Sequence, residues 1–256
     1  MINRRLFSLG TGAAALGGFA GVARAQADAP IVLGQSAPFT GPAAQLGIQF
    51  YEGARLFLDQ YSAQPGARKV VIKQLDDGYE PERTVANTQK LIQEDVFALF
   101  GYIGTPTSVA ALPLAVKDKV PFIAPFTGAM SLREPFHKNV FHLRASYNDE
   151  TALIVNQLHH LGLKKIAVFH QNDAYGKAGL DGVTLALAQH QLKPVAAATV
   201  ERNSVDVANA VKALVAARPD AIVQVSAYKS CAAFIREARK AGYGGTFYNV
   251  SFVGTQ

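Results

Sequence analysis

The stretch FALFGYIGTPTSVAALPLA, residues Phe97–Ala115, contains the transition that decides the fold. Its first residues, Phe97–Phe100, form a short apolar run that is typical of a buried strand. A turn with two glycines follows, and a helical pattern then runs over Ser108–Lys117. This order predicts a strand, a turn that carries the hydroxyl groups of Thr105 and Thr107, and a helix.

The same alternation extends over the first half of the chain from Ile31 onward. Short apolar runs predict buried strands at Ile31–Gly34, Val70–Leu75, Phe97–Phe100 and Pro121–Ala124. Amphipathic segments between them predict helices at Leu46–Tyr61, Pro81–Glu94 and Ser108–Lys117. Strands that alternate with helices indicate a parallel sheet with helices on both faces.

The alternation breaks at residues 133–151, REPFHKNVFHLRASYNDET, where helical periodicity is weak. Within this segment Phe141–Arg144 could be a strand, and Asn148-Asp149 offers an N-cap for a helix through Leu161. We interpret Ala145–Asn148 as a crossing between two lobes. The alternation then resumes, with strands predicted at Lys165–Phe169, Val195–Thr199, Ala221–Val225 and Thr246–Asn249 and helices at Gly179–His190, Val207–Ala217 and Ser230–Ala241.

Two such runs predict an α/β fold of two Rossmann-like lobes, each a parallel sheet flanked by helices. We assign residues 26–146 to the first lobe and residues 147–256 to the second. In open parallel sheets, ligands bind beyond the carboxyl ends of the strands. Two facing lobes would therefore form a ligand cleft between their strand ends.

The composition argues against several other classes of protein. The formal net charge is +6, but residues 1–25 contribute three arginines and no acid, and the remaining basic residues are scattered among acids. This is not the footprint of a nucleic-acid-binding protein. The single cysteine, Cys231, excludes an internal disulfide, and the six histidines do not fall at metal-ligand spacings. We predict no metal site and no cofactor.

The first residues, MINRRLFSLGTGAAALGGFAGVARAQA, have the layout of an export signal. Arg4-Arg5 precedes a weakly apolar stretch, as in twin-arginine signals, and Ala23 and Ala25 suit a cleavage site after Ala25. A membrane anchor is the alternative, but the stretch is rich in Gly, Ser and Thr. We therefore expect a mature protein that is exported, most simply to a bacterial periplasm.

The residues that follow the predicted strands are mostly hydroxyl-bearing, small or aromatic. They contain no Ser-His-Asp set, glycine-flanked nucleophile or phosphate-binding lysine. The pair Asp76-Asp77 is better explained by turn and capping chemistry than by catalysis. Thr105 and Thr107 would place hydroxyl groups beside a helix N-terminus, which favours anions. This turn is therefore interpreted as a receiver for a small carboxylate or an amino acid.

With these residues in view, the chain resembles the type I periplasmic binding proteins of ABC importers. The resemblance is greatest to the branch with the leucine/isoleucine/valine-binding proteins, and it runs from about Ile31 to Gln256. The motifs that carry it are GQSAPFTGPAAQLGIQFYEGARLFLD, LDDGYEPERTVANTQKLI, FALFGYIGTPTSVAALPLA, VPFIAPFTGAMSLR, FHLRASYNDET, VFHQNDAYGKAGLDG and AYKSCAAFIREARKAG. It implies a binding protein and not an enzyme, with a small-molecule ligand and an inner-membrane ABC permease as partners.

The resemblance also implies which residues contact the ligand. Thr105 and Thr107 would hold the ligand carboxylate. The loop after the fourth strand would bind the polar head of the ligand through Phe126, Thr127 and Gly128. The remaining contacts would come from Tyr175, which closes over the ligand from the second lobe, from Tyr228 beside it, and from Leu46 as a wall for the ligand side chain. From its position at a strand end we add Tyr79.

Two features depart from the family pattern. Amino-acid binders of this group place an acid late in the second lobe, against the ammonium group. Here the segment is YNVSFVG, with Ser251 near that point and no carboxylate, so aromatic or other carboxylic acids and amides are also candidate ligands. Members of the family also continue beyond the point that corresponds to Gln256, so we expect the second lobe and the return to the first lobe to be incomplete.

Two other functions are compatible with parts of the pattern. A Rossmann-type enzyme acting on a small acid would need a glycine-rich loop after the first strand, and here that loop is Ser-Ala-Pro-Phe-Thr-Gly. A ligand-sensing receptor domain of the same fold is the other alternative. A gene neighbourhood with permease and ATPase genes would favour transport over sensing.

Overall fold

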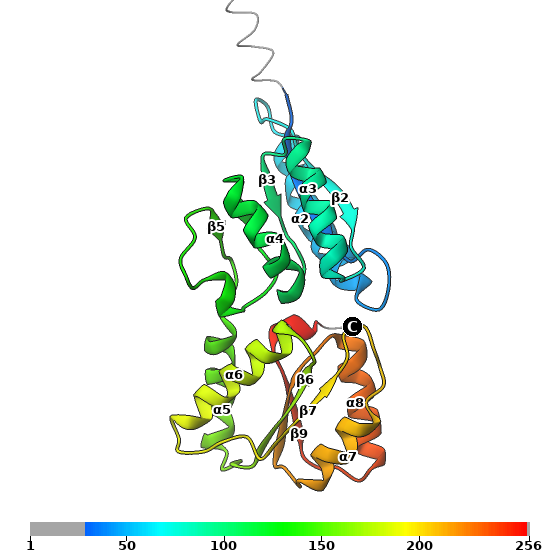
Figure 1. Ribbon diagram of the computed structural model, residues 1–256, viewed down its shortest axis with the longest axis vertical. Coiled ribbons are helices and arrows are strands. Elements are labelled where there is room, and N and C mark those ends of the chain that lie inside the picture. Colours follow the sequence, from blue (N-terminus) through cyan, green and yellow to red (C-terminus); the bar gives the residue numbers. More distant parts are fainter. Residues whose placement is uncertain (1–28, 255–256) are drawn as a thin grey trace, which may run out of the picture.

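The computed structural model describes residues 29–254, which form two α/β lobes connected by a crossing between Phe141 and Tyr147 (Figure 1). The predicted export signal lies outside these residues. The prediction of two lobes with parallel sheets flanked by helices is confirmed. Because the first helix of the second lobe begins at Tyr147, we keep 26–146 and 147–256 as the proposed lobe boundaries.

The first lobe is built on a parallel sheet with the strand order β2-β1-β3-β4-β5. Its strands are β1 (Ile31–Ala37), β2 (Val70–Asp76), β3 (Ala98–Phe100), β4 (Phe122–Ile123) and β5 (Val140–Phe141). Its helices are α2 (Ala44–Ser62), α3 (Pro81–Gln93), α4 (Thr105–Lys117) and the short 3-10 helix η1 (Met130–Leu132). The strand order reverses between β1 and β3, so this lobe has its switch point there.

The second lobe is built on a parallel sheet with the strand order β7-β6-β8-β9. Its strands are β6 (Ile166–Gln171), β7 (Ala196–Val200), β8 (Ala221–Val225) and β9 (Thr246–Asn249). Its helices are α5 (Tyr147–His160), α6 (Ala174–Ala188), α7 (Ala208–Ala216), α8 (Tyr228–Lys240) and the 3-10 helix η2 (Ser251–Val253). Its switch point lies between β6 and β8, and Figure 1 shows the two lobes stacked end to end.

Several predicted boundaries differ from the structure. The N-cap of α5 is Ser146, in place of the predicted Asn148-Asp149 pair, because Ser146 and Asp149 exchange hydrogen bonds as a capping box. Besides α5, four helices begin earlier than predicted, at Ala44, Thr105, Ala174 and Tyr228. The first turn of α4, Thr-Pro-Thr-Ser, consists of residues with weak helix propensity in isolation.

The lobes share a buried core across their boundary. One cluster of buried apolar residues combines Leu46, Tyr79 and Ile103 of the first lobe with the whole interior of the second lobe. A separate cluster, which includes Leu99 and Phe122, lies within the first lobe. The structure therefore shows the lobes closed against each other, with side chains of both packed in one interior.

Candidate functional site

The two switch points place the loops after β1, β3, β6 and β8 at the boundary between the lobes. The N-termini of α4, α6 and α8 lie in these loops, at Thr105, Ala174 and Tyr228. The N-termini of α4 and α8 present backbone N–H groups and the positive ends of their dipoles without a side-chain cap, whereas Asp173 caps α6. The boundary therefore has the elements of an anion-binding site supplied from both lobes.

A pair of buried hydroxyl groups lies at the start of α4. Thr105 Oγ1 is 2.7 Å from Thr127 Oγ1, and both residues are at most 1% exposed. The Ala129 N–H donates to Thr127 Oγ1 at 3.2 Å. Because one hydroxyl must donate to the other, the pair retains one proton that could be donated to a ligand.

Thr107 is oriented differently from Thr105. Its hydroxyl donates to the Gly104 carbonyl at 3.0 Å and also contacts the Ile103 carbonyl, so it bonds to the backbone at the start of its own helix. The structure therefore brings Thr105 and Thr127 together, while the contact of Thr107 with a ligand stays a prediction.

Tyr79 packs against the beginning of α4. Gly104, the N-cap of α4, has φ +91°, and a Cβ built there would lie 2.4 Å from Tyr79 Cε2, so a larger residue would displace the ring. Tyr79 is fully buried and has φ +66°, which is uncommon for an aromatic residue. Its hydroxyl accepts a hydrogen bond from Gln171 Nε2 of the second lobe at 3.4 Å. Tyr79 therefore joins the two lobes at the predicted site.

Tyr175 comes to the same place from the second lobe. Asp173 caps α6 by accepting hydrogen bonds from the N–H groups of Tyr175 and Gly176, at 2.9 and 3.3 Å. The Tyr175 ring is fully buried, and its hydroxyl donates to the Ser226 carbonyl at 3.4 Å. The structure therefore places Tyr175 at the lobe boundary, while its role in closing over a ligand stays a prediction.

Tyr147, which the sequence interpretation missed, completes this group. Its ring centroid is 5.5 Å from that of Tyr175, and its hydroxyl is buried without a hydrogen-bond partner among residues 29–254. Burial raises the pKa of Tyr147 to about 12, although the nearby Thr127 hydroxyl opposes this rise. The hydroxyl is therefore neutral at physiological pH and can donate a hydrogen bond.

Phe252 and Arg144 were also missed. The fully buried ring of Phe252 packs against Tyr175 and Phe126, with centroid distances of 4.6 and 5.7 Å. Phe126 also contacts Arg144, whose guanidinium lies over the Phe126 ring, 4.0 Å from the ring centroid. Arg144 lies in FHLRASYNDET and Phe252 in YNVSFVG, and neither segment has a local pattern that indicates these contacts.

Ser251, in the segment YNVSFVG, is bonded to a carboxylate from another part of the chain. Glu150, at the start of α5, accepts hydrogen bonds from Ser251 N at 2.8 Å and from Ser251 Oγ at 2.6 Å. Glu150 also lies 3.9 Å from Arg144, which donates to Ser251 Oγ. The segment itself holds no acid, as expected, but the fold brings the Glu150 carboxylate to Ser251 from a distant part of the chain.

The other predicted residues lie around this group. A Cβ at Gly128 would be 2.7 Å from Tyr147 N, so glycine is required where the loop after β4 meets the crossing. Leu46 is buried in the first turn of α2, and its Cδ2 would be 3.2 Å from a Cβ at Gly254. Tyr228 donates a hydrogen bond to the Pro42 carbonyl of the first lobe at 2.7 Å.

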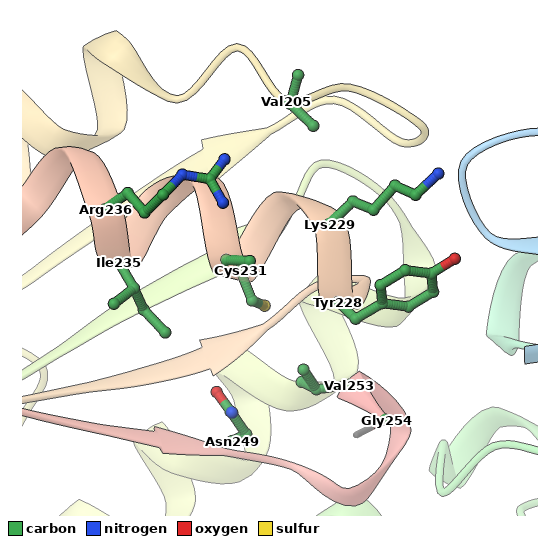
Figure 2. A pocket seen from close by; sticks show the side chains of 10 residues that line it. Val205, Tyr228, Lys229, Cys231, Ile235, Arg236, Asn249, Val253 and Gly254 are labelled. Atoms are coloured by element: carbon green, nitrogen blue, oxygen red, sulfur yellow. The ribbon is translucent and has the colours of Figure 1, made fainter. Parts of the chain in front are cut away.

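Tyr228 also borders a hollow of about 580 Å³ on the second lobe, which is distinct from the buried group. Figure 2 shows Tyr228 and Lys229 at one end of this hollow and Ile235 and Arg236 towards the other. Of the predicted binding residues, Tyr228 is the one that lines it. The hollow is therefore a second surface feature, and Tyr228 stands between it and the first lobe.

Polar side chains join the lobes at the edge strand β2, opposite the edge strand β5 from which the crossing leaves. Arg202 forms ion pairs with Glu80 at 2.8 Å and with Asp173 at 3.4 Å. Asn203 donates to Glu80 Oε1 at 2.8 Å and to the Gly78 carbonyl at 3.1 Å. We refer to Glu80, Asp173, Arg202 and Asn203 as the polar latch.

Asp76 and Asp77 act in the turn after β2, as their turn chemistry predicts. Asp77 accepts hydrogen bonds from Ser36 Oγ and from Tyr79 N, at 2.8 and 2.9 Å. Burial raises the pKa of Asp77 from 3.8 to about 6, against the effect of these hydrogen bonds. For Asp76, burial is outweighed by hydrogen bonds, first from the Thr40 hydroxyl, and its pKa falls to about 2.

The raised pKa of Asp77 predicts how the free energy of unfolding depends on pH. Between pH 3.8 and about 6 the folded protein keeps a proton on Asp77 that the unfolded chain has lost, so stability falls as pH rises through this window. The pKa change of Asp77 corresponds to a loss of about 3 kcal/mol in the free energy of unfolding across this window. In D77N this decline should disappear when urea unfolding is measured from pH 4 to pH 6.5. Parallel stability curves for D77N and the wild type would contradict the prediction.

No group of three or more His, Cys, Asp or Glu residues within residues 29–254 is arranged to hold a metal ion. In the same part of the chain, no helix is both long and apolar enough to cross a membrane.

Known proteins share the fold and the sequence pattern of this chain. A family model described as periplasmic binding protein matches residues 30–256. Among curated relatives, Leu/Ile/Val-binding protein homolog 7 of Brucella abortus (strain 2308) is 27% identical over 236 residues, covering 88% of this chain and 58% of that protein.

Two solved structures are similar over most of the chain. A possible leucine/isoleucine/valine-binding protein from Rhodopirellula baltica SH 1 matches with a TM-score of 0.85 and 36% identity, covering 89% of this chain and 64% of that one. A substrate-binding periplasmic protein from Ralstonia solanacearum matches with a TM-score of 0.81 and 30% identity, covering 87% and 64%. The chain thus spans less than two thirds of the length of these three relatives.

Proposed function

Because the chain belongs to the periplasmic binding protein family, we propose that it is the extracytoplasmic binding component of an ABC importer. It binds a small ligand with a carboxylate or amide group between its two lobes and delivers it to a permease in the inner membrane. The predicted export signal and the family both support a periplasmic location. The role is binding and delivery, since the family consists of binding proteins.

The observation that carries this proposal is the hydroxyl pair of Thr105 and Thr127. The pair is buried at the boundary of the lobes, at the start of α4, where no described side chain caps the helix. A carboxylate placed there would accept the remaining hydroxyl proton and lie near the positive end of the helix dipole. The loop after β4, with Phe126 and Gly128, would border the same group.

Aromatic and apolar side chains would enclose the rest of the ligand. Tyr79 and Leu46 come from the first lobe, and Tyr175 and Tyr228 come from the second. Opening and closing of the lobes about the crossing would admit the ligand and then bury it. Tyr228 and the polar latch would hold the closed form, because both bond across the boundary away from the crossing.

A thermal melt of the chain with and without ligands tests the proposal. The panel contains branched-chain and other amino acids, aromatic carboxylates and amides. A ligand at about 100 times its Kd should stabilise the protein by about 2.7 kcal/mol. For a chain of this size that shift should raise Tm by about 5–10 °C. A melt that no member of the panel changes would contradict the proposal.

A further inference from the structure

Phe252 lies at the centre of the group of predicted binding residues. Its ring is fully buried and is surrounded by Tyr175, Phe126 and Tyr79, at centroid distances of 4.6, 5.7 and 6.1 Å. These three rings come from α6, from the loop after β4 and from the turn after β2, and thus from both lobes. The chain itself therefore supplies a phenyl ring to an aromatic enclosure.

The ring is held in place through its neighbour. Ser251 bonds to Glu150 through both its backbone N–H and its hydroxyl, and it accepts a hydrogen bond from Arg144. Phe252 follows directly in η2, a single turn of 3-10 helix. The bonds that hold Phe252 in the enclosure therefore lie in a single 3-10 turn that follows β9, outside the hydrogen-bonded strands of the sheet.

The enclosure also contains polar groups that a phenyl ring cannot satisfy. Tyr147 Oη and Gln171 Oε1 are buried without hydrogen-bond partners among the described residues. Tyr147 packs on Tyr175, and Gln171 bonds to Tyr79, so both groups adjoin rings that contact Phe252. Buried polar groups are normally paired, and a hydroxyl substituent on an aromatic ring could donate to Gln171 Oε1 or accept from Tyr147 Oη.

We infer that Phe252 occupies the place of the ligand's ring, and that the ligand is a small aromatic carboxylate that displaces it. This inference rests on the proposed function and specifies its ligand class. Aromatic rings favour edge-to-face and offset partners at these distances, which the enclosure provides. An ammonium group is less suited, because Glu150, the carboxylate bonded to Ser251, is already engaged by Ser251 and lies 3.9 Å from Arg144.

The inference is tested by whether F252A binds benzoate more tightly or more weakly than the wild type. If Phe252 competes with the ligand, F252A should bind benzoate at least tenfold more tightly than the wild type, as measured by isothermal titration calorimetry. The affinity of F252A for leucine should increase by a smaller factor. The matched control is F234A, which removes an equally buried ring that stacks on Phe169 inside the second lobe. F234A should bind benzoate with the affinity of the wild type, which would show that loss of core packing alone does not change binding.

The outcomes separate the inference from the proposed function. Weaker binding of benzoate by F252A would show that Phe252 is a wall of the site, which overturns the displacement. A gain for leucine that equals or exceeds the gain for benzoate would overturn the ligand class while leaving the binding function intact. If neither protein binds any amino acid, acid or amide of the panel, the proposed function fails, and the inference fails with it.

A second variant keeps the test valid if F252A does not fold. The chain contains no tryptophan, so F252W introduces a single fluorescent reporter at the centre of the enclosure. Its emission should be blue-shifted in the free protein. Benzoate should shift it to longer wavelength and increase quenching by acrylamide as the ring leaves the enclosure. Blue emission that persists at saturating benzoate would overturn the displacement.

Discussion

Replacing Gly176 with alanine should lower the free energy of unfolding by about 3 kcal/mol, at the upper end of the range for overpacked sites. A Cβ at this position would lie 1.8 Å from the backbone oxygen of Gln171, at the end of β6. This neighbour is backbone, so no side chain can rotate away. The first turn of α6 would have to move, and Tyr175 would move with it. Urea denaturation followed by circular dichroism measures the effect.

Gly53 provides the matched control. It lies within α2 on an exposed face, and a Cβ there would meet no atom within 4 Å. G53A should therefore stabilise the protein by about 0.5–1 kcal/mol, because alanine loses less backbone entropy in a helix. Equal stability of G176A and the wild type would contradict the described contact between α6 and β6.

Loss of either hydroxyl of the Thr105–Thr127 pair should weaken ligand binding by about 10-fold to 100-fold, as expected for a hydrogen bond to a charged group. The two hydroxyls are 2.7 Å apart and share one free proton, so T105V and T127V should not be additive. The double variant should lose little more affinity than either single variant. Calorimetric titration of all three variants with the ligand found by the thermal melt forms the double-mutant cycle.

Thr184 is the control for these valine substitutions. It is exposed on α6, and its hydroxyl donates to the Leu180 carbonyl of its own helix at 2.8 Å. T184V should bind the ligand as the wild type does. Unchanged affinity in T105V and T127V would remove the hydroxyl pair from the binding site, and additive losses would show that each hydroxyl contacts the ligand separately.

The overall architecture could be predicted because it follows from periodicity. Buried parallel strands are continuous apolar runs, and the helices between them are amphipathic, so both are visible without knowledge of the partner elements. The starts of α4, α6 and α8 were harder to predict. These helices begin at Thr105, Ala174 and Tyr228, and the Asp173 cap accounts for the start of α6.

The parts of the candidate site that were missed depend on contacts between distant segments. Glu150 and Ser251 are 101 residues apart in the sequence, yet they form two hydrogen bonds. No local pattern in YNVSFVG shows that Phe252 enters an enclosure of rings from both lobes. By contrast, the position of Thr105, Tyr79 and Tyr175 at the lobe boundary could be predicted, because each follows a strand end, and strand ends converge in this fold.

The polar latch makes the stability of the closed lobes depend on the salt concentration around the protein. Arg202 and Glu80 are partly exposed, so mobile salt screens their attraction, and at about 0.15 M ionic strength this screening acts over roughly 8 Å. The hydroxyl pair is buried and is screened much less. Salt should therefore accelerate opening while leaving the contacts around a bound ligand intact. We expect the residence time of the ligand, more than its rate of capture, to follow the ionic strength of the compartment in which the protein works.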